Sequence, residues 1–458
     1  MNKFSTISPV DQSLLYERSY MSSVDINKLL DRGINGYISW SLVQLGDRKL
    51  LIEKMLNYFL LHKNEISLEI TLQMGRPIRY VSSEIDGMIE RARYMLSIVD
   101  DALSDILIDN KGNSKRKIEK KSVGIVLVIA PWNYPYLTAI NAIVPAILAG
   151  NSVILKHSSQ TALCAERFSE AFKFADFPSD VFQYGHLRHV DAEKMISDSR
   201  INSIAFTGSV LGGYRIKRAA EKRFINLNLE LGGKDPAYVC QDAILSDAAK
   251  SLVEGSFFNA GQSCCGIERI YVNEKVYKIF LDLFLEETHK LVLGDPRDNL
   301  TTLGPIAKAG AAIDINRKRQ LALNGGAVDI VSFDRFTAIG DNYLPPSILT
   351  NVNHNMEIMK EEIFGPVVGI MPVSSDTEAI YLMNDSRYGL TSSVWTQDVD
   401  RANVLCSLSN FGTCFVNCCD YLDPSLAWTG VKDTGIGCSL SILGFNAFTR
   451  PKSINMKI

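Results

Sequence analysis

Three short strings in the chain carry residue types that perform nucleophilic and acid–base chemistry. They are PWNYP at 131–135, LELGGK at 229–234 and FFNAGQSC at 257–264. A cysteine such as Cys264 attacks a carbonyl carbon when a polar, partly exposed setting holds it as a thiolate. Glu230, between apolar residues and glycines, is suited to a general base whose pKa is adjusted by burial. The side-chain amide of Asn133 can donate to a developing oxyanion.

Each of these residues, taken singly, also has an ordinary structural interpretation. An isolated cysteine is most often a small buried hydrophobe, and an isolated glutamate in such a string is more often a paired structural carboxylate. An asparagine on a loop between prolines is most often a turn former. The combination of the three strings, rather than any one residue, therefore carries the functional interpretation.

All three strings, in this order and at these separations, resemble the aldehyde dehydrogenase superfamily, and the resemblance extends from Ser8 to Ile454. Further matching strings are FTGS at 206–209, LGDP at 293–296, LGP at 303–305, EEIFGPV at 361–367 and GVKDTGIG at 430–437. The resemblance implies NAD(P)-dependent oxidation of an aldehyde to the free acid. Cys264 would form a thiohemiacetal and then a thioester. Asn133 and a backbone N–H near Cys264 would hold the oxyanion, Glu230 would activate the hydrolytic water, and Cys265 would be a structural neighbour or a redox partner.

The resemblance also implies a site for NAD or NADP, in a Rossmann-like fold that lacks the usual GxGxxG string. Gly208 and Ser209 would begin a helix whose N-terminal N–H groups and dipole favour the pyrophosphate, and Gly212 would permit close approach. These three residues predict the phosphate end of the cofactor site.

The remaining matched cofactor residues lie in three other segments. Lys156 ends a predicted strand and would bond the adenosine ribose, and Trp132 lies in the loop beside it. Glu362 and Phe364 match the pair that positions the nicotinamide ribose and ring.

The residues after Lys156 depart from the common pattern of the family. Most relatives have proline next and, three residues beyond the lysine, a glutamate that binds the ribose 2′-OH of NAD. Here the string is Lys156, His157, Ser158, Ser159. Loss of that carboxylate removes its repulsion of a 2′-phosphate, and Ser159 can donate a hydrogen bond to one. NADP is therefore expected to be accepted, or even preferred over NAD.

The substrate is less well determined by the sequence. Some succinate-semialdehyde dehydrogenases have an arginine six residues before the nucleophile, where this chain has Phe258. Asp420, Tyr421 and Asp423 lie in the segment that lines the substrate entrance in relatives, and exposed acids there would suit a cationic or amino aldehyde. The alternatives that remain are a succinate-semialdehyde dehydrogenase, an acyl-CoA-forming relative and a catalytically silent structural member. Cys438 and Ser439 replace the family's usual Arg-Glu.

The predicted elements alternate in type along the chain. Amphipathic helices are expected within 27–100, and buried strands at 123–130, 152–155, near 181 and at 203–206, with a helix at 162–174. Strands at 237–239, 270–272 and 367–371 suggest a second α/β unit. The uncharged run 122–155 is long enough to cross a membrane, but its prolines and asparagines argue for a protein interior. The fold class is α/β, with a doubly wound nucleotide-binding domain.

The predicted domain boundaries are 1–103 and 123–231 for NAD(P) binding, 232–440 for catalysis, and 104–122 with 441–458 for a small β oligomerisation element. The basic string 111–121 is a surface hairpin or subunit contact. By resemblance the protein is a homodimer or homotetramer.

Composition sets the remaining expectations. The 458 residues have a net charge of −3, so the protein has no overall electrostatic attraction for nucleic acid or an anionic membrane. The nine cysteines include no CxxC and no metal-site spacing, so we expect reduced thiols, no metal and a cytoplasmic location. The partner expected is a small-molecule aldehyde.

Overall fold

The uncharged run after residue 122 forms the centre of a parallel sheet. Strands β5 (Ile125–Ala130) and β6 (Ser152–His157) are buried along their whole length and pair in parallel, and helix α5 (Pro135–Leu148) connects them. The computed structural model, which describes residues 3–111, 113–332, 336 and 339–457, thus confirms a strand–loop–helix–strand unit in the protein interior. No helix of the described residues is long and apolar enough to cross a membrane.

The sheet around β5 has the strand order β17-β9-β8-β5-β6-β7. Its other strands are β7 (Phe182–Tyr184), β8 (Ile201–Thr207), β9 (Asn226–Glu230) and β17 (Gly435–Ile436). The chain moves from β5 outward through β6 and β7, then returns to the other side of β5 through β8 and β9. In such open sheets ligands bind where the order reverses, at the carboxyl ends of the strands. Here that crevice lies beyond β5 and β8.

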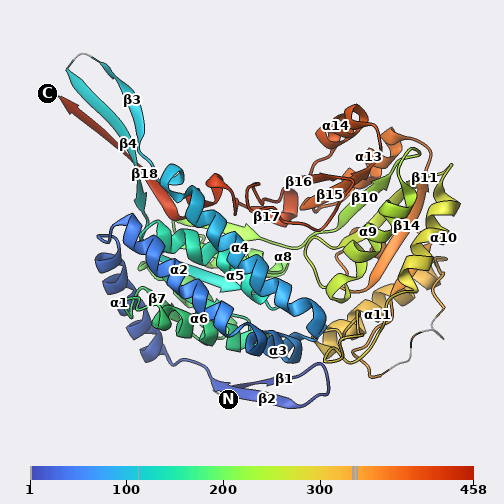
Figure 1. Cartoon of the computed structure of the whole chain (residues 1–458), viewed down its shortest axis with the longest axis horizontal. Helices are drawn as coiled ribbons and strands as arrows, with labels where there is room; N and C mark the ends of the chain where they lie inside the picture. Colours follow the sequence, from blue (N-terminus) through green and yellow to red (C-terminus); the bar gives the residue numbers. More distant parts are fainter. Residues whose placement is uncertain (1–2, 112, 333–335, 337–338, 458) are drawn as a thin grey trace.

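Helices cover both faces of this sheet (Figure 1). One face packs against α1 (Ser23–Trp40), α7 (His189–Ser197) and α8 (Val210–Ala219). The other packs against α5 and α6 (Ala162–Phe174), with α2 (Leu45–Leu61), α3 (Lys63–Met74) and α4 (Ile78–Ala102) outside them. The amphipathic helices expected within 27–100 are confirmed.

A second sheet of order β12-β13-β14-β11-β10-β15-β16 forms the other half of the molecule. Its strands are β10 (Asp235–Val239), β11 (Ile267–Asn273), β12 (Val328–Asp329), β13 (Ser347–Thr350), β14 (Val367–Val373), β15 (Thr391–Trp395) and β16 (Thr413–Val416). All neighbouring strands are parallel except β12. The predicted second α/β unit is therefore present.

Helices also cover the second sheet on both faces. On one face lie α9 (Leu245–Phe257) and α10 (Tyr277–Thr288). On the other lie α11 (Ala309–Asn324), α12 (Glu357–Lys360), α13 (Asp376–Asn384) and α14 (Val399–Leu408).

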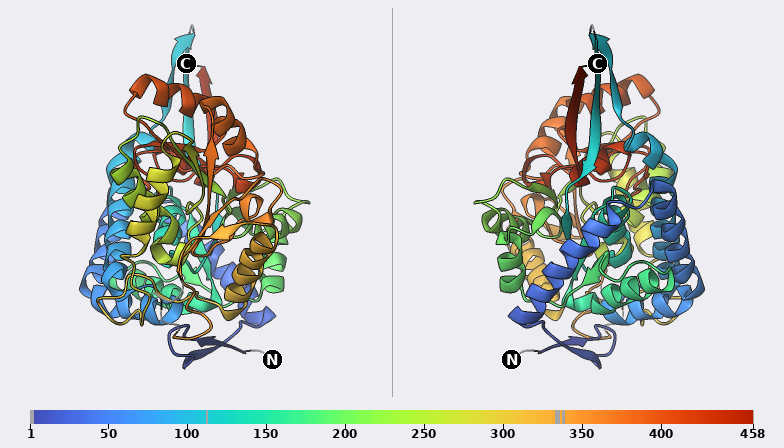
Figure 2. Two further views of the ribbon diagram at one scale, coloured as in Figure 1. Left: turned by 90° about the vertical axis from the view of Figure 1, so that its right-hand side faces the viewer. Right: turned by 90° about the vertical axis from the view of Figure 1, so that its left-hand side faces the viewer.

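Two small antiparallel sheets complete the described chain. The first, β1 (Lys3–Ile7) with β2 (Leu14–Ser19), lies near α3. The second joins β3 (Ile106–Lys111), β4 (Ser114–Ser122) and β18 (Thr449–Lys457) into a tongue that projects from the body (Figures 1 and 2). Gly112, within the predicted hairpin, lies outside the described residues.

The C-terminal segment contributes to three parts of the fold. Strand β17 pairs with β9 of the first sheet, the 3-10 helix η5 (Ile442–Phe448) packs against α4 and α5, and β18 enters the tongue. The division into three domains stays a prediction.

Candidate active site

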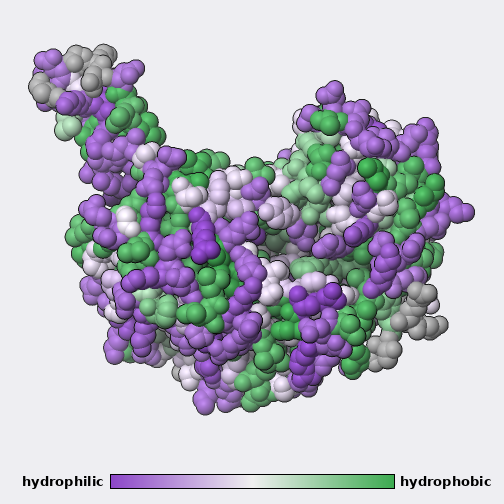
Figure 3. Space-filling view, viewed as in Figure 1, coloured by the Kyte–Doolittle hydropathy of each residue, from purple (hydrophilic) through white to green (hydrophobic). Residues whose placement is uncertain are grey.

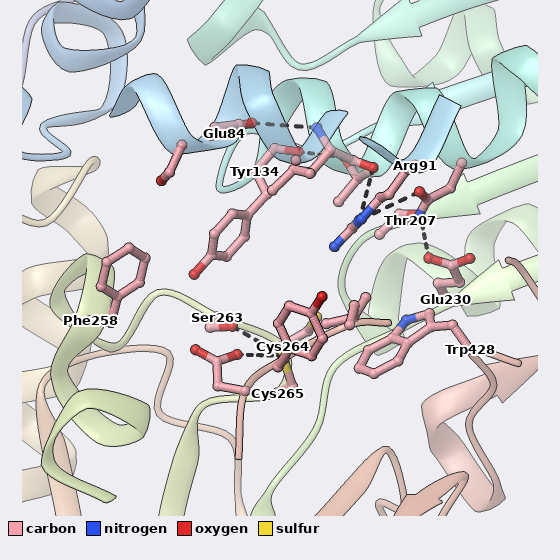
Figure 4. Close-up of a pocket in the computed structure, with 18 of the residues that line it drawn as sticks. Glu84, Arg91, Tyr134, Thr207, Glu230, Phe258, Ser263, Cys264, Cys265 and Trp428 are labelled. Carbon is pink, nitrogen blue, oxygen red and sulfur yellow. Dashed lines mark hydrogen bonds between the residues drawn. The ribbon is translucent and has the colours of Figure 1, made fainter. Parts of the chain in front are cut away.

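A cavity of about 380 Å³ contains several of the residues singled out from the sequence. Cys264, Glu230, Phe258, Asp420 and Tyr421 all line it. Figure 3 shows the molecule hollowed between its two halves, and Figure 4 shows the cavity walls. Helix α4 and the start of α5 form one wall, and the segment before β11 forms the opposite one.

The nucleophile loop, residues 258–264, begins in a tightly wound backbone. Asn259, Ala260 and Gly261 have φ values of 54°, 56° and 69°, the left-handed region that non-glycine residues rarely adopt. The turn ends α9 and leaves the free thiol of Cys264 partly exposed in the cavity. Three successive residues in this region indicate a backbone that its surroundings hold in place.

Gly233 supports this loop from the adjacent string. A Cβ at Gly233 would lie 2.3 Å from the backbone oxygen of Cys264. The LELGGK and FFNAGQSC strings therefore contact each other. Glycine is required at position 233 because the backbones of these two segments approach closely.

A buried network fixes Asn133 to the nucleophile loop. Asn133 Nδ2 donates to the carbonyl of Gln262 at 3.2 Å, and Asn259 Nδ2 donates to the same carbonyl at 3.2 Å. Arg76 donates to the carbonyl of Asn133 and, at 3.1 Å, to Asn259 Oδ1. Arg76 also forms an ion pair with Glu84, and both side chains are almost completely buried. The side-chain amide of Asn133 is thus held by the nucleophile loop, and its backbone carbonyl by Arg76 just before α4.

The backbone N–H of Cys264 is the second candidate donor for an oxyanion. It has no hydrogen-bond acceptor among the described residues. An unpaired N–H beside a nucleophile and a fixed amide is the arrangement that stabilises a tetrahedral oxyanion.

Glu230 ends strand β9 with its carboxyl group at the cavity wall. It accepts hydrogen bonds from the hydroxyl of Ser439 and, at 3.3 Å, from Thr207 Oγ1. Burial raises the pKa of Glu230 above its ordinary value, while the hydroxyl donors oppose this rise. A carboxylate whose pKa moves toward neutrality is suited to take a proton from water.

The predicted adenosine end of the cofactor site contains an unpaired buried lysine. Lys156, at the end of β6, is only 7% exposed, and its ammonium has no hydrogen-bond or ion-pair partner among the described residues. Burial, assisted by the nearby charge of Lys308, lowers the pKa of Lys156 to about 8. A buried ammonium without partners fits a site that receives hydroxyl or phosphate groups from a ligand.

The predicted phosphate end of the site lies at the start of α8. Ser209 is the N-cap and its Oγ accepts from the N–H of Gly212 at 3.2 Å. A Cβ at Gly208 or Gly212 would lie 2.7 or 2.6 Å from the ring of Phe206, so both glycines are needed for this packing. The helix start faces the crevice beyond β8, where an anion is favoured.

Phe364, one of the two residues predicted to position the nicotinamide, lies against Trp132 of the loop near Lys156. Trp132 and Phe364 pack edge to face with centroids 5.7 Å apart, and the ammonium of Lys308 lies 5.7 Å from the Trp132 ring centre. Glu362 accepts from the N–H of Gly233 at 3.1 Å, and burial raises the pKa of Glu362 to about 8.

The predicted substrate residues divide into two groups. Phe258 packs edge to face against Tyr80, and Tyr421 is exposed at the cavity. Asp420 differs from the exposed loop acid expected, because it is half-buried, accepts from Cys265 Sγ at 2.9 Å, and burial raises its pKa to about 7. Asp423 accepts from Ser425 and is not among the described residues that line the cavity.

Sequence reasoning missed Arg76, Glu84, Arg91 and Ser439. The first three are charged residues on or just before an amphipathic helix, where charge ordinarily indicates a solvated face. Ser439 is 209 positions from Glu230, and its only signal was its departure from the family pattern.

The sequence matches the aldehyde dehydrogenase family model over residues 1–454. The chain belongs to the aldehyde dehydrogenase family.

Two enzymes of Escherichia coli (strain K12) are similar to this aldehyde dehydrogenase along most of their length. Succinate semialdehyde dehydrogenase (NAD(P)+) Sad is 30% identical over 456 residues, covering 98% of this chain and 97% of Sad. NADP/NAD-dependent aldehyde dehydrogenase PuuC is 32% identical over 468 residues, covering 98% and 92%. A crystal structure of succinic semialdehyde dehydrogenase from Streptococcus pyogenes with NADP+ has a TM-score of 0.95 at 29% identity, covering 99% of this chain and 100% of that one.

These similarities confirm the predicted fold and general function. The protein is an oxidoreductase that uses NAD(P) to oxidise an aldehyde. The buried, unpaired Lys156 and the helix start after β8 fit such a cofactor.

Proposed function

We propose that Cys264 is the nucleophile of this aldehyde dehydrogenase, with Asn133 and Glu230 as its catalytic partners. Its sulfur attacks the aldehyde carbon, and the carbonyl oxygen becomes an oxyanion between Asn133 Nδ2 and the N–H of Cys264. The observation that carries this proposal is the buried network that fixes Asn133 to the nucleophile loop. When bound, NAD(P)+ supplies the hydride acceptor that turns the thiohemiacetal into a thioester.

Glu230 acts in the hydrolysis of that thioester. Its carboxylate takes a proton from water as the water oxygen attacks the thioester carbonyl, the carbon–sulfur bond breaks, and the acid leaves. The hydroxyl groups of Ser439 and Thr207 hold the carboxyl group in place. A buried carboxylate with only hydroxyl donors remains basic enough for this step, because no cation neutralises it through an ion pair.

A matched set of variants tests these roles. Cys264→Ala is expected to abolish NAD(P)H formation, Asn133→Ala to lower it by about 100-fold as the loss of one oxyanion donor does, and Glu230→Gln to stop turnover after a burst of one NAD(P)H per site. Cys265→Ala is the control and keeps most of the activity. Full activity of folded Cys264→Ala would overturn the assignment.

Two alternatives give different outcomes in the same assays. An acyl-CoA-forming enzyme would need CoA for turnover and would tolerate Glu230→Gln. A catalytically silent member would give no NAD(P)H with any aldehyde and a Cys264 inert towards iodoacetamide. The partly exposed thiol and the carboxylate in one cavity favour the hydrolytic enzyme.

We propose that NADP is accepted at least as well as NAD. Ser159 is exposed beside Lys156, and its hydroxyl has no partner among the described residues. The ring of His157 is held in the interior, with its nitrogens 3.1 Å from the carbonyl oxygen of Pro135 and from Thr161 Oγ1. It therefore does not occupy the space next to Ser159. Ser159→Glu is expected to raise KM for NADP by at least tenfold and to spare NAD, because the new carboxylate repels the 2′-phosphate.

We also propose that the tongue joins subunits of a cytoplasmic homodimer or homotetramer. Leu107 is 80% exposed and Met456 is 50% exposed, and Ile106 and Ile108 are exposed as well. Exposed apolar side chains on a projecting sheet are typical of an interface. Leu107→Asp is expected to lower the mass measured by light scattering, and an unchanged mass would contradict the proposal.

A further inference from the structure

Arg91 is a cation in the active-site cavity that forms no ion pair with a carboxylate of the described residues, although the charge of Glu230 acts on it from across the cavity. It lies on α4 and lines the cavity together with Cys264 and Glu230. Figure 4 shows its guanidinium group projecting from the α4 wall into the cavity that Cys264 also borders. Its Nη1 donates to the carbonyl of Leu137 at 3.2 Å and to Asn141 Oδ1 at 3.4 Å. Among the described residues, Nε and Nη2 have no partner.

The carboxylates on the α4 side of the cavity all point to other partners or to solvent. Glu84 is paired with Arg76, and Asp86 is paired with Lys63 at 2.6 Å. Glu90 is exposed. None of these groups forms an ion pair with Arg91.

The two acids on the other walls are also engaged elsewhere. Glu230 accepts from two hydroxyl groups, and Asp420 accepts from the thiol of Cys265. Burial raises the pKa of both carboxyl groups, which weakens the negative charge that either places near Arg91. A guanidinium group stays charged even when burial lowers its pKa, as it does for Arg91. Arg91 is therefore a permanent cation in the cavity that also contains Cys264, and its guanidinium group keeps two donor nitrogens without a partner among the described residues.

The approach to Arg91 is open because of a glycine one turn earlier. Gly87 lies four residues before Arg91 on the same face of α4 and also lines the cavity. A Cβ there would lie 3.1 Å from Leu137 Cδ2, so any side chain would crowd the space between α4 and α5. A planar guanidinium with two free donor nitrogens matches the geometry of a carboxylate.

We infer that Arg91 binds the distal carboxylate of the substrate, so that the enzyme oxidises short aldehydes bearing a carboxylate at the other end. This inference rests on the proposed function, because it assumes that Cys264 attacks the aldehyde group. The charge that an arginine at position 258 would supply is provided from α4 instead. A cationic aldehyde, which exposed acids near 420 would have suited, is disfavoured because Arg91 repels it.

Steady-state rates with matched aldehydes test the inference. The anionic set is succinate semialdehyde and glutarate semialdehyde, the neutral set is butanal and pentanal, and 4-aminobutanal is the cation. The unaltered enzyme is expected to prefer the anionic over the neutral set by about 100-fold in kcat/KM, the scale of a desolvated charge pair. Arg91→Gln should remove this preference, mainly through KM, and change the neutral set less than threefold.

Two variants separate recognition from structure. Arg91→Lys should recover part of the preference, because it keeps the charge and loses the planar donor pair. Arg93→Gln is the matched control, since Arg93 lies on the same helix but pairs with Glu53 on the half-exposed surface. A loss with Arg91→Gln that is equal for anionic and neutral aldehydes would show that Arg91 only adjusts Glu230 or the fold, and would overturn the inference.

A measurement on the unaltered enzyme does not depend on variant folding. Butyrate should protect Cys264 from iodoacetamide at concentrations at least tenfold lower than butanamide does, because only butyrate carries a carboxylate for Arg91. Equal protection by the acid and the amide, or a preference for 4-aminobutanal, would overturn the inference. Cys264-dependent oxidation of butanal with no preference for anionic aldehydes would do so while leaving the proposed function intact.

Discussion

Replacing Ser439 with alanine is expected to make Glu230 a base that works only at higher pH. The Ser439 hydroxyl donates to Glu230 Oε1 and accepts from Asn228 Nδ2 at 3.1 Å, so it is oriented toward the carboxylate. Burial raises the pKa of Glu230 and this hydrogen bond opposes the rise. Without the donor, the pKa rises further.

The size of the effect follows from the type of hydrogen bond. A hydrogen bond to a charged group contributes about 1.5–3 kcal/mol, so below its pKa the deprotonated fraction of Glu230 falls by roughly 10- to 150-fold. Above the pKa of the variant the carboxylate is ionised in both proteins, and the difference disappears. The expected signature is a displacement of the acid limb of the pH profile with an unchanged plateau.

Hydrolysis of p-nitrophenyl acetate isolates this step from the cofactor. The burst reports acylation of Cys264 and the steady rate reports hydrolysis of the acyl-enzyme, and both are measured between pH 5 and 9. Thr207→Val should displace the acid limb less, because its hydrogen bond is longer, and Cys438→Ala is the control. An acid limb that stays in place in Ser439→Ala, or a plateau lowered equally at every pH, would refute the reasoning.

Three further predictions concern stability and the nucleophile. Glu84→Gln leaves Arg76 buried without its partner and should lower the free energy of unfolding in urea by about 3–5 kcal/mol; a loss below about 1 kcal/mol would contradict this. Gly233→Ala places a Cβ against the backbone oxygen of Cys264 and should slow the acylation burst by about 100-fold in a folded protein, and an unchanged burst would count against it. The pKa of Asp420 is raised to about 7, so the folded state holds this proton more tightly and the carboxyl destabilises the fold as pH rises from about 4 to 7. Asp420→Asn should therefore be more stable than the unaltered protein at pH 8, by up to about 4 kcal/mol, with the gap closing at pH 4; a gap that widens in acid would disprove the assignment.

Local sequence patterns predicted the fold because each predicted strand or helix needs the elements next to it to bury its apolar residues. The uncharged strands at 123–130 and 152–155 require cover on both faces, and helices on both sides of the sheet provide it.

The charged lining of the site was not predictable in the same way. Arg76, Glu84 and Arg91 have the composition of a solvated helix face, and only the packing of α4 against α5 encloses them. Asp420 is read from sequence as a loop acid, whereas its contact with Cys265 joins residues 155 positions apart. Such contacts depend on how two sheets meet, which no local periodicity encodes.

The pairing of β17 with β9 has a consequence for the order of synthesis. Gly435 lies opposite Glu230 in the ladder, the N–H of Leu231 donates to the carbonyl of Thr434 at 2.8 Å, and Ser439 bonds the Glu230 carboxyl. A ribosome has made all of the first sheet's other strands by residue 230, but the edge beside Glu230 forms only after residue 439 has emerged from the exit tunnel. A chain interrupted between residues 264 and 439 has Cys264 but not the support of Glu230, so the two parts of the site are completed far apart in time during synthesis.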